Sequence, residues 1–260
     1  MSLMANFLAT SGVDYAWLTD VGRVRARNED SVAVDAALGL LVVADGMGGH
    51  NAGDVASRMA VEGVLAAMQR DAAASPGGGA DGAAVDDDAQ RLLAALRHAN
   101  DAIYDAAGED YERSGMGTTV VAVWLRSTGL LAAHVGDSRL YRLRGGAIEP
   151  LTRDRTQVQD LVDRGILTPA QARVSGRRNM LSRALGTYRE VEIDCAAHPC
   201  APGDVYLLCS DGLTNMVEDG EIAAIVVGSP SLDEATDRLV ALANERGGRD
   251  NITVALARLG

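Results

Sequence analysis

Residues 40–46 read Leu-Leu-Val-Val-Ala-Asp-Gly, an unbroken apolar run that ends in a carboxylate and a glycine. An apolar run of this length before a turn is typical of a strand buried on both faces. A second apolar run, Val32 to Asp35, precedes it across the short glycine-containing turn Ala36 to Gly39. So short a connection favours an antiparallel hairpin over a crossover between parallel strands. The stretch therefore predicts a hairpin that presents Asp45 at one end.

Strands and helices alternate in blocks on either side of this hairpin. The pattern predicts further strands over 13–19, 118–125, 130–135, 139–143, 190–196, 205–209 and 252–257. Helical spacing predicts helices over 54–70, 89–107, 157–164, 169–174, 218–227 and 232–245. Antiparallel runs interrupted by two helical pairs indicate a single α+β domain, residues 13–258. The segment 72–88, rich in Gly and Ala, is expected to be a flexible loop, and its run Asp86 to Asp88 favours a solvated helix start over a metal site.

Composition excludes several classes of protein. The 260 residues carry 24 basic and 36 acidic side chains, a formal net charge of −12, and every basic residue is Arg. A chain without lysine excludes Schiff-base chemistry, a lysine base and the phosphate-binding P-loop lysine. An acidic balance without a basic run argues against nucleic-acid binding and against a polybasic membrane site. Although only 3% of residues are aromatic, 47% are hydrophobic, which is enough for a well-filled core.

The cysteines and the termini bear on the compartment. Cys195, Cys200 and Cys209 are an odd number without a CxxC spacing, so a disulfide framework and a structural zinc site both fit poorly. No apolar run approaches the roughly 20 residues that span a bilayer. Residues 1–12 lack the basic and long apolar regions of a secretory signal. We expect a reduced, cytoplasmic protein that is not in a membrane, with Cys209 in the core.

A recurring placement of aspartates indicates the chemistry. Apolar strands lead into Asp45, Asp137 and Asp211, each beside a glycine, and a Gly-rich loop leads into Asp250. Asp-Gly also forms ordinary turns, which would explain any one of these residues alone. Carboxylates that converge beside buried strands are costly unless paired, so four of them together predict a multivalent cation. Oxygen ligands without Cys or His favour Mg²⁺ or Mn²⁺.

The loop Gly46 to His50 lies between a strand and a helix, as in dinucleotide-binding proteins. Asn51 stands where the third glycine of GxGxxG belongs, and the strand before the loop is part of a hairpin. A nucleotide-binding dehydrogenase is therefore disfavoured. The glycines would instead allow backbone carbonyls to approach a metal ion.

Three arginines alternate with apolar residues just before an acidic cluster. Arg23, Arg25 and Arg27 would share one face of an extended segment. Two interpretations stay open: a solvated charged face, or a site where one guanidinium holds an anion bidentately.

Six short motifs follow one another along nearly the whole chain, from about Asp14 to Arg258. They are Arg25-Ala-Arg-Asn28-Glu29-Asp30, Val43-Ala-Asp45-Gly46-Met-Gly-Gly-His50, Gly115-Met-Gly117-Thr118-Thr119, Val135-Gly-Asp137-Ser138-Arg139, Cys209-Ser-Asp211-Gly212-Leu213 and Gly248-Arg-Asp250-Asn251. The series resembles the motifs of the bacterial metal-dependent protein phosphatases, also called the protein phosphatase 2C family. The resemblance implies a four-layer α-β-β-α sandwich of two antiparallel sheets flanked by helical pairs.

The resemblance also implies a centre of two Mn²⁺ or Mg²⁺ ions with a third, weaker site. Asp45 would bridge the two ions, and the Gly46 carbonyl would bind one of them. Asp211 and Asp250 would hold the other ion, and Asp137 with Asp211 would form the weaker site. Two such ions lower the pKa of a bridging water and neutralise charge on phosphorus.

Further roles are implied around these ligands. Glu29 and Asp30 would support the metal-bound waters, and Arg25 would hold the substrate phosphate. Met47 occupies the position of a histidine proposed as general acid in eukaryotic members, and His50 is close enough in sequence to compensate. The acid that protonates the leaving group is therefore left unassigned.

The implied activity is hydrolysis of phosphoserine and phosphothreonine in proteins by a hydroxide that bridges the metal ions, which opposes Ser/Thr kinase signalling. The expected partners are phosphorylated Ser/Thr proteins, among them a Ser/Thr kinase and its substrates, and the expected state is a monomer. The alternative is a pseudophosphatase that binds without turnover, disfavoured because every ligating position is present.

Segment 152–186 resembles the mobile flap over the family's active site. Asp154-Arg155-Thr156 stands where Asp-His-Ser is common, and Ser175-Gly176 where His-Pro is common, so the target stays open. His98, His134 and His198 are expected to be structural.

Overall fold

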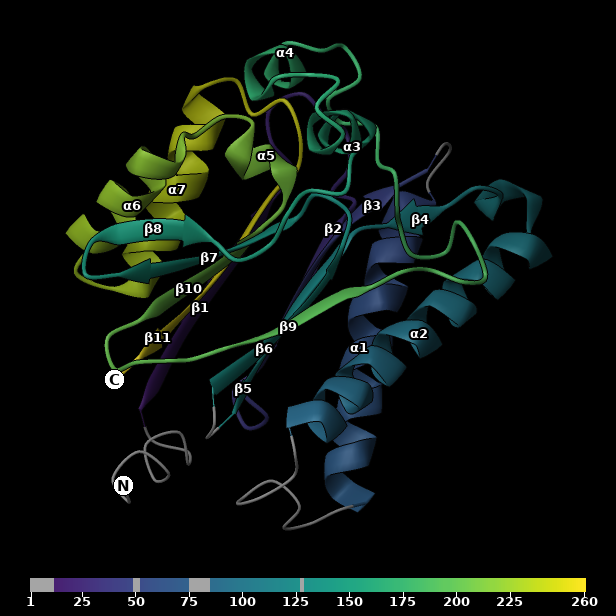
Figure 1. The fold of residues 1–260 in the computed structure, drawn as a ribbon, viewed down its shortest axis with the longest axis horizontal. Coiled ribbons are helices and arrows are strands. Elements are labelled where there is room, and N and C mark those ends of the chain that lie inside the picture. Colours follow the sequence, from purple (N-terminus) through teal and green to yellow (C-terminus); the bar gives the residue numbers. More distant parts are fainter. Residues whose placement is uncertain (1–11, 49–51, 75–84, 127–128) are drawn as a thin grey trace.

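The computed structural model describes residues 12–48, 52–74, 85–126 and 129–260, which build two facing antiparallel sheets (Figure 1). The first sheet has the order β1-β11-β10-β7-β8. Its strands are β1 (Val13–Asp20), β7 (Arg139–Arg144), β8 (Ala147–Pro150), β10 (Val205–Cys209) and β11 (Ile252–Leu259). The second has the order β2-β3-β5-β6-β9, and β4 also pairs with β3. Its strands are β2 (Asp30–Asp35), β3 (Leu40–Met47), β4 (Gly117–Thr118), β5 (Val120–Arg126), β6 (Gly129–Val135) and β9 (Asp194–His198).

Helices cover the outer face of each sheet (Figure 1). The second sheet is covered by α1 (Gly53–Ala74) and α2 (Val85–Glu109), and the first by α5 (Asp211–Thr214), α6 (Asp219–Gly228) and α7 (Leu232–Glu245). A short 3₁₀ helix, η1 (Tyr111–Arg113), follows α2, while α3 (Gln157–Asp163) and α4 (Pro169–Arg173) lie beyond one end of the sandwich. Within the described ranges, no helix has both the length and the apolar character that a membrane crossing requires.

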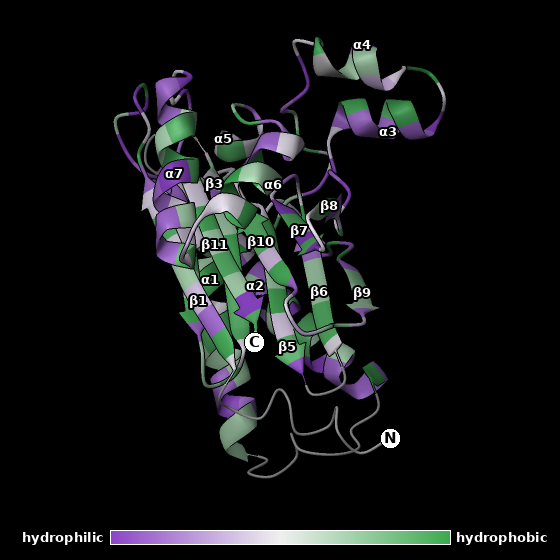
Figure 2. Ribbon diagram, turned by 90° about the vertical axis from the view of Figure 1, so that its left-hand side faces the viewer, coloured by the Kyte–Doolittle hydropathy of each residue, from purple (hydrophilic) through white to green (hydrophobic). Residues whose placement is uncertain are grey.

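Three hydrophobic clusters separate the four layers. One lies between the sheets, one between the second sheet and α1–α2, and one between the first sheet and α5–α7. β3 contributes to two of them: Leu41 and Val43 enter the cluster between the sheets, whereas Leu40, Val42 and Ala44 face the helices. Alternate residues of a strand point to opposite faces, so a strand in a central layer is apolar throughout. The strands are accordingly predominantly hydrophobic in Figure 2. The α-β-β-α sandwich is confirmed.

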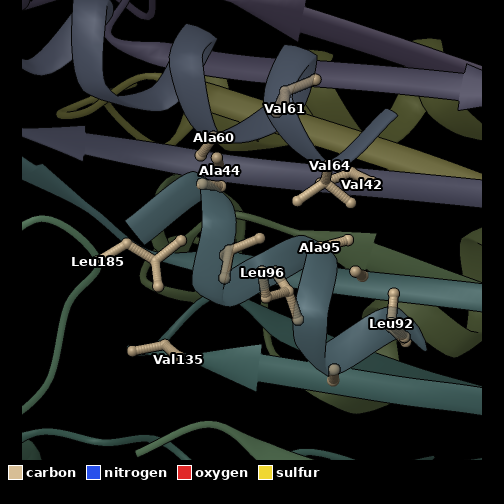
Figure 3. Close-up of a cluster of buried hydrophobic side chains, with 14 of the residues drawn as sticks. Val42, Ala44, Ala60, Val61, Val64, Leu92, Ala95, Leu96, Val135 and Leu185 are labelled. Atoms are coloured by element: carbon tan, nitrogen blue, oxygen red, sulfur yellow. The ribbon is translucent and has the colours of Figure 1, made fainter. Parts of the chain in front are cut away.

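The predicted hairpin is present. β2 and β3 pair antiparallel, with Asp30 opposite Asp45. The helix expected over 54–70 is also present, although its most buried face includes small residues as well as larger ones. Ala56 and Ala60 are fully buried beside Val64, which allows α1 to pack closely on β3 and α2 (Figure 3). Close packing of this kind is the reason interiors tolerate little change in side-chain volume.

Several elements differ from the predictions; for example, the strand expected over 118–125 is divided into β4 and β5. The helices extend further into segment 72–88 than expected, because α1 continues to Ala74 and α2 begins at Val85; residues 75–84 lie outside the described ranges. The strand expected over 190–196 runs over Asp194–His198, since Val191 and Ile193 pack against the α1–α2 cluster before pairing begins. β8 was not predicted, although the Gly145-Gly146 turn before it has the positive φ angles typical of a tight hairpin.

Asp88 departs from the expectation of a solvated helix start. It is buried, and its carboxylate accepts hydrogen bonds from Arg126 Nε at 2.9 Å and Arg91 Nη1 at 3.2 Å. Asp86 and Asp87 are exposed in the first turn of α2, as expected. Arg126 also stacks over the Trp124 ring, 4.2 Å from its centroid. Asp88 therefore serves an ion-pair network between α2 and β5, and its partners are arginines.

Candidate metal centre

A cleft of about 400 Å³ opens at one end of the sandwich. The topology explains why two of the four aspartates, Asp211 and Asp250, meet there. β10 and β11 run antiparallel, so the residues just after β10 and just before β11 lie at the same edge of the sheet. The cleft is lined by Arg25, Glu29, Asp45, Gly46, Met47, Gly48, Thr119, Asp137, Asn179, Met180, Leu181, Asp211 and Asp250. The structure thus brings together all five of the expected ligand positions.

Asp45 is held by its backbone on both sides. Its amide donates to Thr119 Oγ1 at 2.9 Å, and its carbonyl accepts from Thr118 Oγ1 and from the Thr119 amide, each at 2.9 Å. Thr119 Oγ1 also lies 2.7 Å from Ser138 Oγ, beside Asp137. The two threonines therefore fix the end of β3 and connect it to the turn that carries Asp137.

Two glycines beside the aspartates are required by close backbone approaches. A Cβ on Gly46 would stand 2.0 Å from the Gly53 carbonyl oxygen, and one on Gly212 would stand 1.9 Å from the Asn251 carbonyl oxygen. Neither neighbour is a side chain that could move aside. The absence of a side chain at Gly46 also leaves its backbone at the cleft wall, as a carbonyl ligand would need.

The carboxylates of Asp211 and Asp250 differ in how they are satisfied. Asp211 opens α5, and its Oδ2 accepts from Asn215 Nδ2 at 2.9 Å, while its Oδ1 is buried without a hydrogen-bond partner. Asp250 Oδ1 accepts from the Asn251 amide at 2.9 Å, and its Oδ2 accepts from Arg25 Nη2 at 2.8 Å. A buried unpartnered carboxylate oxygen is costly, so Asp211 requires a partner that the protein does not supply.

Burial and mutual repulsion raise the pKa values of this cluster. Burial, then the nearby Asp30, Asp211 and other carboxylates, raises the pKa of Asp45 well above its ordinary value. Burial followed by the charge of Asp211 raises the pKa of Asp137 to about 8. Burial followed by the charge of Asp250 raises the pKa of Asp211 to about 6. Each carboxylate thus resists ionisation, and a nearby cation would reverse that preference.

These features fit a hard divalent cation. In the described part of the chain, no three Asp, Glu, His or Cys side chains gather tightly enough around one point to ligate an ion by themselves. Asp250 contributes to this spacing, because both of its carboxylate oxygens already accept hydrogen bonds, from Arg25 and from the Asn251 amide. The donors are nevertheless oxygens, they repel one another, and Asp211 Oδ1 has no partner. Such a set suits Mg²⁺ or Mn²⁺ completed by water.

Of the three alternating arginines, only Arg25 lines the cleft. The expectation of an extended segment was wrong: residues 22–27 form a turn followed by bends. Asn251 holds this loop, because its Nδ2 donates to the carbonyls of Val21 at 2.9 Å and Arg27 at 2.8 Å, while its Oδ1 accepts from the Glu29 amide at 2.8 Å. The loop conformation separates the arginines and leaves Arg25 at the cleft.

Glu29 and Asp30 occupy different environments. Glu29 lines the cleft, and burial raises its pKa. Asp30 lies beneath the cleft, where its Oδ2 accepts from Ser210 Oγ and Thr253 Oγ1, both at 2.7 Å. Burial raises the pKa of Asp30 to about 7, although those two hydrogen bonds lower it. Asp30 thus joins β2 to β10 and β11 and is not among the residues that line the cleft.

Several cleft residues were not predicted as site residues. Asn179, Met180 and Leu181 come from segment 152–186 and line the cleft opposite the loop ends of the sheets. Backbone bonds hold this stretch, since the Gln157 amide donates to the Met180 carbonyl at 2.8 Å and Thr156 forms a bridge with Leu181. No local sequence pattern predicts that these three residues line the cleft, because the contacts that place them join residues far apart in the chain. Thr119, which lines the cleft, and Asn251, which holds the loop of Arg25, belong to the sequence motifs, but no role was predicted for either.

The remaining predictions concern histidines and cysteines. His98, His134 and His198 are not among the cleft residues, and His50 lies outside the described ranges. His134 Nε2 lies 2.9 Å from the Arg153 carbonyl oxygen, and burial lowers its pKa. Cys209 is fully buried in β10, and burial raises its pKa to about 12, which confirms a core position.

Comparison with known proteins identifies the family to which this two-sheet sandwich and its carboxylate cleft belong. The sequence profile described as Protein phosphatase 2C matches residues 23–257, so the chain belongs to the protein phosphatase 2C family.

Two curated relatives are similar over almost the whole chain. PstP, a serine/threonine protein phosphatase of Mycobacterium tuberculosis, is 42% identical over 243 residues, which cover 94% of this chain and 44% of PstP. The chain thus spans less than half the length of that relative. The serine/threonine phosphatase stp of Listeria innocua is 38% identical over 92% of both proteins.

Solved structures agree. The crystal structure of M. tuberculosis PstP/Ppp matches with a TM-score of 0.83 and 40% identity, covering 96% of this chain and 99% of that one. The PstP catalytic domain in complex with two manganese ions matches with a TM-score of 0.80 and 40% identity, covering 95% of this chain and 98% of that one.

Proposed function

We propose that this chain is a metal-dependent protein serine/threonine phosphatase that hydrolyses phosphoserine and phosphothreonine in proteins. The observation that carries the proposal is the meeting of four aspartates from four separate segments of the chain in one cleft, with an oxygen of Asp211 that has no protein partner. Membership of the protein phosphatase 2C family and the names of the relatives support the same activity.

The cleft residues divide into ligands for two Mn²⁺ or Mg²⁺ ions. Asp45 would bridge the ions, Gly46 would offer its carbonyl to one, and Asp211 and Asp250 would hold the other. Asp137 with Asp211 would form a third, weaker site. When bound, the ions would activate a water for attack on phosphorus and neutralise the negative charge that develops there. The two-manganese complex of PstP supports a binuclear centre.

The protein's own side chains would place the substrate. Arg25 lines the cleft with a side chain that is 47% exposed, and its guanidinium can exchange Asp250 for two phosphate oxygens. Glu29, whose carboxylate lies 4.0 Å from the Arg25 guanidinium, would orient water beside it. Asp30 would act from beneath, by holding Ser210 next to Asp211. A cysteine nucleophile is disfavoured, because none of the three cysteines lines the cleft and burial raises the pKa of Cys209 to about 12.

The proposed phosphatase function also implies a domain organisation, natural substrates, an oligomeric state and a location. Residues 13–258 would form one catalytic domain, with residues 152–186 as a flap. The natural substrates would be phosphorylated proteins, among them a Ser/Thr kinase and its targets. The protein would act as a monomer in the cytoplasm.

Hydrolysis of a phosphothreonine peptide tests the activity. We expect phosphate release with added Mn²⁺, none with EDTA, and none by Asp45→Asn. Calorimetric titration with Mn²⁺ provides a second readout, because Asp45→Asn should also lose binding. A protein that binds Mn²⁺ and the peptide but releases no phosphate would contradict the proposal and indicate a binding module with the same fold.

A further inference from the structure

The flap segment, residues 152–186, differs in charge from the rest of the molecule. It contains seven Arg and three Asp and no Glu, a net charge of +4 in a chain of net −12. The rest of the chain therefore carries −16. An acidic ligand is repelled by most of this protein and attracted by the flap segment, which contributes to the wall of the cleft.

Three of the seven arginines of the flap segment pair with carboxylates. Arg155 pairs with Asp194, Arg183 with Glu192, and Arg153 with Asp163. The pairs of Arg155 and Arg183 join the flap segment to β9 and to the residues just before it. The pair of Arg153 joins the residues before α3 to the end of α3. These three guanidinium groups are therefore neutralised within the protein.

Arg177 and Arg178, in contrast, directly precede Asn179, which lines the cleft. Both are exposed in the turn 176–179, and neither lies within ion-pair distance of a carboxylate in the described ranges. Backbone bonds define the turn: the Arg178 amide donates to the Ser175 carbonyl at 3.2 Å, and the Met180 amide donates to the Arg177 carbonyl at 3.0 Å. The turn thus presents two adjacent, unneutralised guanidinium groups.

The turn stands directly at the rim of the cleft. Asn179, the residue after Arg178, lines the cleft together with Met180 and the four aspartates. Consecutive Cα atoms are about 3.8 Å apart, and an extended peptide advances by roughly 3.3–3.6 Å per residue. A peptide whose phosphorylated residue enters the cleft would therefore bring side chains about two to four residues away within reach of this turn. Figures 1 and 2 both place α3 and α4, which precede the turn, beyond the end of the sheets and clear of the helical layers.

We propose that Arg177 and Arg178 select phosphorylated protein segments that carry Asp or Glu two to four residues from the phosphorylated residue. This inference rests on the proposed phosphatase function and names its substrate class. The arginines would act as specificity residues at the rim and would not touch the reacting phosphate. Guanidinium groups suit this role, because they bind carboxylates bidentately and stay charged at any physiological pH.

The expected size of the effect follows from exposure. An exposed ion pair changes affinity by less than about fivefold, so two pairs would give roughly a tenfold preference. Added salt would reduce it, because charges in solvent are screened over about 8 Å at physiological ionic strength.

A pair of phosphothreonine peptides tests the proposal. One carries Glu and the other Gln at positions −4 to −2 and +2 to +4, and kcat/KM is measured for both with Mn²⁺ at 50 mM and 500 mM NaCl. We expect wild type to prefer the Glu peptide by about tenfold at low salt and less at high salt. In Arg177→Glu/Arg178→Glu the ratio should fall to about one or below. Because each variant is compared on two peptides, a general loss of activity cancels.

Arg97→Glu is the matched control, since Arg97 is an exposed arginine on α2 without an ion pair in the described ranges, away from the cleft residues. It should keep the wild-type ratio. A wild-type ratio near one, or a ratio that survives Arg177→Glu/Arg178→Glu, would overturn the proposal while leaving the phosphatase function intact. Failure of wild type to hydrolyse either peptide would overturn the phosphatase function itself.

Discussion

At the scale of single residues, the cleft is held together by hydrogen bonds that oppose the repulsion among its carboxylates. Thr118 and Thr119 hold the backbone of Asp45, and Asn251 holds the loop that carries Arg25. None of these neutral groups cancels the negative charge, which is why burial and repulsion raise the pKa values of Asp45, Asp137 and Asp211. The site therefore carries an electrostatic cost, which either protonation or a bound cation offsets.

Asp211→Asn should separate metal binding from folding. Loss of a ligand expected to serve two sites should weaken Mn²⁺ binding and kcat/KM by at least about a hundredfold, because even indirect supports of metal ligands are worth 10- to 100-fold. The melting temperature of the EDTA-treated protein should stay the same or rise, since the substitution removes repulsion. Calorimetry and thermal melts measure the two effects. Asp237→Asn, an exposed change on α7, is the control, and normal Mn²⁺ affinity in Asp211→Asn would refute the assigned role.

Arg25→Ala should weaken substrate binding more than it slows turnover. Removing a charged hydrogen-bonding contact with phosphate costs about 2–3 kcal/mol, which corresponds to roughly 30- to 150-fold in KM for a phosphopeptide. Arg23→Ala and Arg27→Ala should change KM little, because neither side chain lines the cleft. A normal KM in Arg25→Ala would transfer the phosphate contact to one of these neighbours.

At the scale of elements, the helical layer of α1 and α2 supports the sheet that carries Asp45. Leu96 of α2 is fully buried in the cluster that also contains Ala60 and Val42 (Figure 3). Leu93, on the same helix, is only half-buried and lies outside that cluster. The pair allows the contribution of one buried contact to be measured without changing the helix.

Leu96→Ala should lower the free energy of unfolding by about 2–5 kcal/mol, the range for buried leucines whose removal leaves a cavity. Leu93→Ala should cost less than about half as much, because water already reaches part of that side chain. Urea unfolding of both variants provides the comparison. Equal losses in the two would contradict the packing described for α2.

Element boundaries show where local pattern fails. The strand β2 and the helices α3, α4 and α7 agree with their predicted spans within one or two residues, because apolar spacing and turn residues are local signals. β9 begins four residues later than predicted, since Asn100 Nδ2 donates to the carbonyls of Tyr188 at 3.1 Å and Arg189 at 2.9 Å and holds the approach on α2. A contact of that range has no local signature.

At the scale of the whole molecule, the carboxylate cluster links stability to pH. A carboxyl group whose pKa is higher in the folded than in the unfolded protein stabilises the folded state below its unfolded pKa of about 4, and this contribution is lost as the pH rises through the folded value. The folded values are about 6 for Asp211, about 7 for Asp30 and about 8 for Asp137. The metal-free protein should therefore lose stability between about pH 4 and pH 8.

Mn²⁺ should reverse this loss, because it competes with protons for the same oxygens. The difference in melting temperature between Mn²⁺ and EDTA samples should be larger at pH 8 than at pH 5.5, by several degrees. Each 1 kcal/mol corresponds to about 2–4 °C for a chain of this size. Asp45→Asn should show a much smaller difference at both values. A Mn²⁺ effect that is independent of pH would contradict the linkage.

The amino-acid sequence by itself determined the hairpin, the apolar central strands and the five positions that meet in the cleft. These features are carried by local spacing and by the residue types that hard cations require. Only the tertiary structure decided that Arg25, and neither Arg23 nor Arg27, lines the cleft, that Asp30 lies beneath it, and that the turn with Arg177 and Arg178 stands at its rim. These outcomes depend on hydrogen bonds and packing between residues far apart in the chain, which local patterns do not encode.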